Sequence, residues 1–182
     1  KFFVAGHTYG SPINNDLGLY KPFMGEMKHN NNFYFGVLTG DFVYQNTIEE
    51  YDRVDLDIES FGVPVHFVAG GHEVFDYRNY FGNEVWERKK RKSPSLQENN
   101  YFANRYGVKG KTYYSFDYKG DLFIALDGNI NAWNIEGQQM DWFKGVMTDA
   151  SMYNNIFIFI HQVVWNTKKG KFSSIRLNNH TG

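Results

Sequence analysis

The sequence predicts an α/β domain, and three features lead to that prediction. Four short apolar runs have the length and composition of buried strands: residues 1–5, 33–39, 63–69 and 155–160. The first three recur about every thirty residues with helical patterns between them, which is the spacing of βαβ units with parallel strands. Two further strand-like runs flank the dipeptide Lys119-Gly120, as in a hairpin.

Length and composition indicate a packed globular protein without disulfide bonds. Of the 182 residues, 42% are hydrophobic and none is cysteine, so a metal site would have to use His, Asp, Glu or Asn. The length fits one domain spanning residues 1–182. The stretch after residue 164 predicts no closing element, which leaves open that this domain is incomplete at its C-terminal end.

Charge and hydropathy exclude two classes of partner. The formal net charge is −1, and the one basic run, residues 87–92, is short enough to be a solvated loop, so we expect no nucleic-acid footprint. No apolar run approaches the roughly 20 residues needed to cross a bilayer. The compartment stays open, because a cysteine-free chain suits either side of a membrane.

The first half of the chain predicts alternating strands and helices. After the strand at residues 1–5, we expect a helix at 17–29 and a second strand at 33–39. The third strand, 63–69, carries Pro64 near its beginning, where a missing backbone donor does least harm.

A capping-box pattern starts the helix between the second and third strands. Thr47 is placed to accept a hydrogen bond from a helix-start amide, and Glu50 is placed to reach back to the Thr47 amide. This helix is expected to continue to about Ser60, and Gly62 ends it.

The second half predicts a hairpin, a helix and a last strand. Residues 79–110 are irregular, aromatic and charged. We expect them to form an insertion that covers one edge of a functional site at the ends of the strands. The hairpin strands are 111–118 and 121–127, and apolar residues at helical spacing follow at 136–150. The strand at 155–160 is continuously apolar.

Polar side chains capable of binding a metal stand where four of these strands end. They are His7, Asp41, His72 and His161, and glycines precede the first three. Because ligands of open α/β sheets bind beyond the carboxyl ends of the strands, we expect these residues to converge on one site. Neighbouring glycines would allow positive φ and close approach. His66 lies inside a strand instead and predicts a core or surface histidine.

The same segments resemble the calcineurin-like metallophosphoesterases. The resemblance lies in Gly40-Asp41, in the GGHE segment from Gly70 to Glu73, and in the spacing to His161. The hairpin and the helix after it are also similar to those of the family. The resemblance covers residues 2–164, almost the whole chain.

The resemblance implies a two-sheet β-sandwich flanked by helices, a four-layer α/β/β/α arrangement. It also implies a two-metal centre, with Mn, Fe or Zn, that hydrolyses a phosphomonoester or phosphodiester, either a small molecule or a polymer. Asp41 matches the metal-bridging aspartate, and His161 matches a ligand of the second metal. His7 matches the histidine of the first motif, and His72 matches the histidine that assists the leaving group.

Three departures from the family pattern predict a weaker metal site. Ala5 stands where the first motif has aspartate, and Gly71 stands where the third motif has asparagine. The family's Gly-His-x-His motif does not follow His161, although His180 is a candidate for a displaced ligand. The remaining ligands would leave each metal below the usual three or four, so occupancy of both positions is in doubt.

Two functions therefore remain open. One is a metal-dependent phosphoesterase whose further ligands lie beyond Gly182, and the other is a non-catalytic module on the same scaffold that binds a sugar, polymer or protein. The retained strand-end residues favour the enzyme. Aromatic residues near them predict either rim packing or a stacking surface for a nucleoside, sugar or aryl ester; they are Tyr9, Phe42, Tyr44, Phe75, Tyr77 and Trp165.

Overall fold

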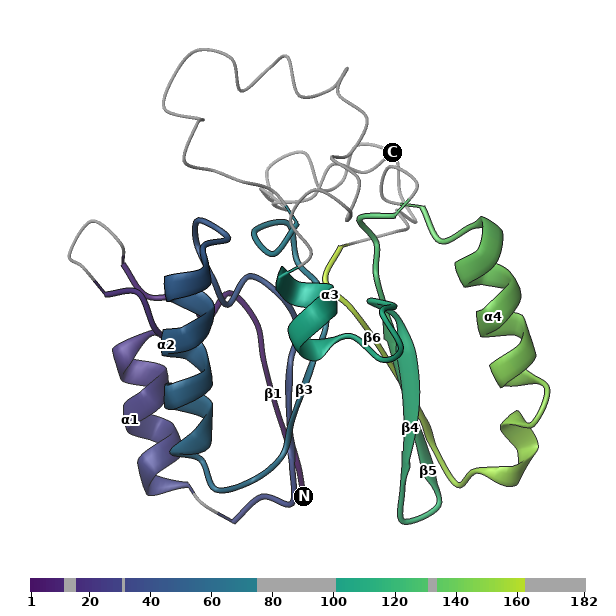
Figure 1. Ribbon diagram of the computed structural model, residues 1–182. Coiled ribbons are helices and arrows are strands. Elements are labelled where there is room, and N and C mark those ends of the chain that lie inside the picture. The colour runs from purple at the N-terminus through teal and green to yellow at the C-terminus, as the bar shows by residue number, and fades with distance from the viewer. Residues whose placement is uncertain (12–15, 31, 75–100, 131–133, 163–182) are drawn as a thin grey trace, which may run out of the picture.

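Two β-sheets lie between layers of helices in the computed structural model (Figure 1). The structure describes residues 1–11, 16–30, 32–74, 101–130 and 134–162. Each sheet has three strands among the described residues, and the sheets pack against each other with helices on their outer faces. The four-layer α/β/β/α arrangement predicted from the resemblance is confirmed.

The first sheet is parallel and has the order β1-β2-β3. Its strands are β1 (Phe3–Ala5), β2 (Gly36–Leu38) and β3 (Val65–Phe67). The helices α1 (Lys21–His29) and α2 (Ile48–Glu59) connect them and cover the outer face (Figure 1). This is the predicted βαβ arrangement.

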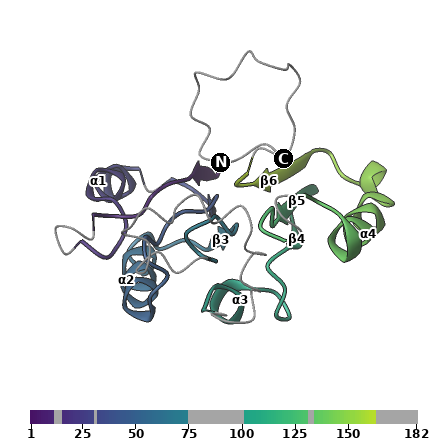
Figure 2. The ribbon, with the colours of Figure 1, turned by 90° about the horizontal axis from the view of Figure 1, so that it is seen from above.

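The second sheet has the order β4-β5-β6. Strands β4 (Tyr114–Tyr118) and β5 (Asp121–Leu126) form the predicted antiparallel hairpin, and both residues of the Lys119-Gly120 turn have positive φ. Strand β6 (Ile156–Ile160) pairs with β5 in parallel, and α4 (Gly137–Met147) covers the outer face, as the view from above shows (Figure 2).

Alternating side chains of β5 separate the core into layers. Phe123 and Ala125 point into the core between the sheets, whereas Leu122, Ile124 and Leu126 point into the core under α4. A third core lies between the first sheet and its helices. The two sheets are thus fixed to each other by an aromatic inner layer.

Three elements differ from the prediction. α1 begins at Lys21 rather than at residue 17, because Leu19 pairs with Tyr9 in a β-bridge and Tyr20 is extended. A short helix, α3 (Tyr101–Tyr106), lies where irregular chain was expected. The helix predicted to residue 150 ends at Met147 and is followed by the 3-10 turn Ala150–Met152. Residues 75–100, and the basic run within them, lie outside the described residues.

Among the helices that the structure describes, none combines the length and the hydropathy of a membrane span.

Candidate metal centre

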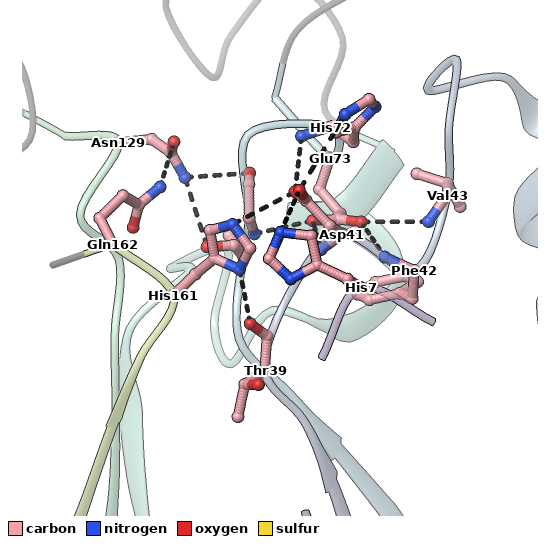
Figure 3. Close-up of polar contacts among 12 residues, drawn as sticks. His7, Thr39, Asp41, Phe42, Val43, His72, Glu73, Asn129, His161 and Gln162 are labelled. Atoms are coloured by element: carbon pink, nitrogen blue, oxygen red, sulfur yellow. Dashed lines mark hydrogen bonds and ion pairs between the residues drawn. The ribbon is translucent and has the colours of Figure 1, made fainter. Parts of the chain in front are cut away.

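The four strand-end residues meet at one rim of the sandwich, although they come from both sheets (Figure 3). His7, Asp41 and His72 follow β1, β2 and β3 of the first sheet, and His161 follows β6 of the second sheet directly. The convergence that the sequence predicts is therefore present.

The Asp41 carboxylate lies at the centre of the group. Its Oδ2 is 3.3 Å from His7 Nε2 and 4.0 Å from His72 Nε2, and its Oδ1 is 3.5 Å from His161 Nε2. The Asp41 and His161 side chains are buried, whereas the His7 side chain is 44% exposed. The group is thus open to solvent on the side of His7.

Backbone carbonyls orient two of the imidazole rings. His161 Nδ1 is 2.7 Å from the Thr39 carbonyl oxygen, and His72 Nδ1 is 2.6 Å from the Tyr44 carbonyl oxygen. A carbonyl can only accept a hydrogen bond, so each Nδ1 carries the proton, and Nε2 is the ring atom directed at Asp41. Metal-binding histidines are commonly oriented by such a bond from the other ring nitrogen.

A buried carboxylate shapes the loop that carries Asp41. Glu73, with no exposed surface, accepts hydrogen bonds from the amides of Asp41, Phe42 and Val43 at 2.8, 2.8 and 3.2 Å, and from the Gly70 amide at 2.7 Å. Burial, and secondly the charge of Asp41, raise the pKa of Glu73 to about 7, against the amide bonds that lower it. Glu73 therefore joins the loops after β2 and β3.

Glycines allow these loops to approach each other closely, which explains the small residues seen in the sequence. A Cβ on Gly40, where φ is +89°, would stand 2.7 Å from His161 Nδ1. A Cβ on Gly70 would stand 2.4 Å from Asp41 Oδ1. His7 and Asp41 themselves have positive φ, a conformation that side chains other than glycine rarely adopt and that recurs at functional sites.

The charges of the group are coupled through Asp41. Burial alone would raise the pKa of Asp41, but the hydrogen bond and charge of His161, together with His72, keep that pKa below its usual value. For His161, burial favours the neutral ring, yet Asp41 raises its pKa. Burial lowers the pKa of His7 more than Asp41 raises it. Asp41 therefore stays ionised at neutral pH, as a metal ligand must.

The donor atoms fit a divalent transition metal. One ligand atom from each of His7, Asp41 and His161 lies within 4.8 Å of the other two. Two ligands of a tetrahedral zinc ion stand about 3.3 Å apart, because each bond is about 2.0–2.1 Å long. The separations from Asp41 are close to that spacing, 3.3 Å from Oδ2 to His7 and 3.5 Å from Oδ1 to His161, so each histidine faces a different oxygen of the carboxylate. Imidazole with carboxylate suits zinc, iron or manganese.

Two of the aromatic residues predicted near the site lie at it. The His72 ring is in contact with Tyr9 and Tyr44, at centroid distances of 5.1 and 5.2 Å, and the two tyrosines are 5.3 Å apart. Phe42 is a correction: it has no exposed surface and packs on Phe67 in the core, since its side chain points away from the rim.

Some predicted site residues lie outside the described part of the chain. They are Phe75, Tyr77, Trp165 and the candidate ligand His180.

Two buried amide side chains at the rim were not predicted. Asn129 follows β5, and its Nδ2 donates to the Gly70 carbonyl at 3.1 Å; Gln162 follows His161, and its Nε2 donates to Asn129 Oδ1 at 2.7 Å. Asn129 and Gln162 stand just after the ends of strands, and the same sequence position predicted the histidines of the site.

Comparisons with known proteins concern the fold of the chain. No family model matches the sequence, and no curated protein matches it. Among solved structures, the chain is similar to a dimetal phosphatase from Danio rerio, with a TM-score of 0.53 and 15% identity, over 90% of this chain and 70% of that one.

The chain is also similar to the purple acid phosphatase PPD1 from yellow lupin (Lupinus luteus) seeds. The TM-score is 0.58 and the identity 16%, over 95% of this chain but only 32% of the lupin chain. The fold is that of the metallophosphoesterases. At these identities the comparisons establish the fold and leave the activity to be argued from the site.

Proposed function

We propose that this chain is a metal-dependent phosphoesterase that hydrolyses a phosphomonoester or phosphodiester. The observation that supports the proposal is the meeting of His7, Asp41 and His161 around one point, with His161 oriented by a backbone carbonyl. The fold is shared with a dimetal phosphatase and a purple acid phosphatase, which makes phosphoester hydrolysis the first chemistry to test.

Each residue has a separate task in this proposal. His7, Asp41 and His161 would hold Mn, Fe or Zn, which supplies Lewis-acid and water-activating chemistry when bound. His72 would exchange a proton with the leaving-group oxygen through Nε2, because its Nδ1 is committed to the Tyr44 carbonyl.

The substrate would be a small-molecule or polymer phosphoester. Tyr9 and Tyr44 lie beside the proposed proton donor, so a planar leaving group such as an aryl group or a nucleobase would have aromatic faces to contact.

Metal content and hydrolysis test the proposal together. We expect the purified protein to bind Mn, Fe or Zn and to hydrolyse p-nitrophenyl phosphate or bis(p-nitrophenyl) phosphate, with added Mn²⁺ increasing the rate. A folded protein that binds no metal and turns over neither compound would contradict the proposal. That outcome would support a binding module on the same scaffold.

Asp41→Asn tests whether the central carboxylate is needed for metal binding without changing the fold. The change keeps the size of the side chain but removes its charge, so we expect metal binding and activity to be lost while the circular dichroism spectrum is kept. Asp141→Asn is the matched control, because Asp141 is exposed on α4, which covers the outer face of the second sheet (Figure 2). Unchanged metal content in Asp41→Asn would remove Asp41 from the site.

A further inference from the structure

The proposed metal site is divided between two sheets, so its geometry depends on how their rims are joined. Asp41 and His7 belong to the first sheet, whereas His161 belongs to the second. The His161–Thr39 hydrogen bond crosses between the sheets, but it uses a proposed ligand itself. A second connection that uses no ligand lies next to it.

The side chain of Asn129 makes that connection (Figure 3). Its Nδ2 donates to the carbonyls of Gly70 and Ala69, at 3.1 and 3.4 Å, in the loop that leads to His72 and Glu73. Its Oδ1 accepts from Gln162 Nε2 at 2.7 Å, and Gln162 follows His161 in the chain. One amide thus joins the loop after β3 to the loop after β6.

Asn129 is itself firmly held. The Asp127 Oδ1 accepts from the Asn129 amide and from its Nδ2, both at 2.8 Å, and the Asp127 Oδ2 accepts from Thr112 at 2.6 Å. Gln139 of α4 bonds to both backbone groups of Asp127, at 2.8 and 2.9 Å. Asp127, Asn129, Gln139 and Gln162 are each at most 3% exposed, so these bonds are shielded from water.

We propose that Asn129 is a positioning residue, which sets the distance between His161 and Asp41 by joining the two sheet rims. The inference rests on the proposed function, since it assumes that these two residues bind one metal. Mutation of the hydrogen-bond partners of metal ligands typically changes affinity 10–100-fold, and Asn129 bonds to Gly70 and Gln162 in the two segments that carry His72 and His161. Without its amide, the loop at Gly70 and the segment at Gln162 would lose their shared partner.

The test compares two substitutions of Asn129 with a control substitution elsewhere in the second sheet. Asn129→Asp keeps the size of the side chain but removes both amide protons, so a carboxylate oxygen would face the Ala69 and Gly70 carbonyls and the Asp127 carboxylate with no side-chain proton between them. Asn129→Ala removes the whole group. Asn155→Ala is the matched control, because Asn155 also donates to a carboxylate, Asp121 Oδ1 at 2.8 Å, but is exposed and lies at the opposite end of the second sheet.

Two measurements are made on each folded variant. Zinc affinity is measured by calorimetry, and we expect Kd to rise about tenfold or more in both Asn129 variants and to stay unchanged in Asn155→Ala. The Nδ1 proton of His161 is followed by NMR in the metal-free protein. We expect this resonance to be protected from exchange in the wild type and to broaden or vanish in the Asn129 variants.

The outcomes are distinguishable. Folded Asn129 variants with wild-type zinc affinity and an unchanged His161 resonance would overturn the inference, as would equal effects of Asn155→Ala. If the wild type binds none of Mn, Fe and Zn, the proposed function fails, and the NMR measurement still decides the role of Asn129. If Asn129→Ala does not fold, Gln162→Met, which removes only the hydrogen bond from residue 162 to Asn129, is expected to give the same two changes.

Discussion

Gly70 lies so close to Asp41 that no larger residue fits between the two loops. A Cβ on Gly70 would stand 2.4 Å from Asp41 Oδ1 and 2.8 Å from Glu73 Oε2. Gly70→Ala is therefore expected to displace the Asp41 carboxylate, to weaken zinc binding at least tenfold and to lower Tm, because both carboxylates are buried and hydrogen-bonded. Calorimetric titration with zinc and thermal unfolding measure the two effects.

Gly25→Ala is the control for that change. Nothing lies within 4 Å of a Cβ on Gly25, which is inside α1. Alanine is the better helix former, so this variant should gain about 0.5–1 kcal/mol of unfolding free energy and keep its metal affinity. A Gly70→Ala protein that binds zinc as tightly as Gly25→Ala would show that close approach at Gly70 is unimportant.

His66 gives the protein a pH dependence that is separate from the metal site. Its ring stacks on Phe116 with centroids 3.5 Å apart, and burial lowers its pKa to about 4, from 6.5. Between these values the unfolded chain binds the proton and the folded chain does not. The contribution of His66 to the unfolding free energy is therefore fully present above pH 6.5 and is lost as the pH decreases toward 4.

Denaturant unfolding at several pH values measures this effect. The loss between pH 6.5 and pH 4 is expected to be about 1–2 kcal/mol, after allowance for the partial exposure of the ring. His66→Phe keeps an aromatic ring against Phe116 but has no titratable group, so its stability should fall less over the same interval. Identical pH profiles for the two proteins would exclude His66 as the source.

The sequence predicts the ionisable residues of the site better than their partners. Strand ends of one parallel sheet lie at the same edge, so the rule found His7, Asp41 and His72 without knowledge of the packing. His161 also ends a strand, but that strand belongs to the second sheet, so its place beside Asp41 depends on how the sheets pack. The carbonyl of Thr39 is different, because its bond to His161 joins residues 122 positions apart. Such a contact depends on how the sheets pack, and no local pattern indicates it.

At the scale of elements, α2 shows how a helix start can shape a neighbouring site. The Thr47 side chain accepts from the Glu50 amide at 3.3 Å, and the Glu50 carboxylate returns to the Thr47 amide, as the capping-box pattern predicts. The same carboxylate also accepts from the amides of Tyr44 and Gln45. The Tyr44 carbonyl orients His72, so the cap of α2 also supports the rim.

Thr47→Ala tests the contribution of this cap. Loss of the threonine oxygen leaves a helix-start amide without its side-chain partner, and the expected cost is about 1 kcal/mol of unfolding free energy. Thr148→Ala is the matched control, because Thr148 follows the end of α4 and its hydroxyl donates to the Lys144 carbonyl on an exposed surface. Equal stability losses in the two variants would mean that the cap contributes nothing of its own.

Elements with a repeating pattern could be predicted, and those that depend on tertiary contacts could not. The hairpin was predicted because Lys119-Gly120 supplies the positive φ values of its turn. α3 was missed because its six residues are too few for a helical period, and they are helical where Phe102 and Tyr106 pack around Phe42.

For the whole molecule, the residue pattern alone predicted an α/β fold, whereas the two-sheet sandwich came from the family resemblance. The strand at 121–127 has apolar side chains on both faces, and its sequence does not indicate which face packs on another sheet and which packs on a helix. Aromatic residues decide this in the structure: Phe2 and Phe35 beside the first sheet meet Phe123 of the second, at centroid distances of 5.3 and 5.1 Å. These contacts hold together the two sheets from which Asp41 and His161 come.

Substitutions at two adjacent residues of β5 can distinguish an effect on the stability of the molecule from an effect on the geometry of its site. Phe123 and Ile124 are both buried, but Phe123 lies between the sheets and Ile124 lies under α4. Replacement by alanine should cost about 3–5 kcal/mol at Phe123 and about 2–5 kcal/mol at Ile124. Because only Phe123 contacts both sheets, only Phe123→Ala is expected to weaken zinc binding, measured on the folded fraction at low temperature. Equal affinities would mean that the rim contacts alone fix the distance between Asp41 and His161, without help from the core.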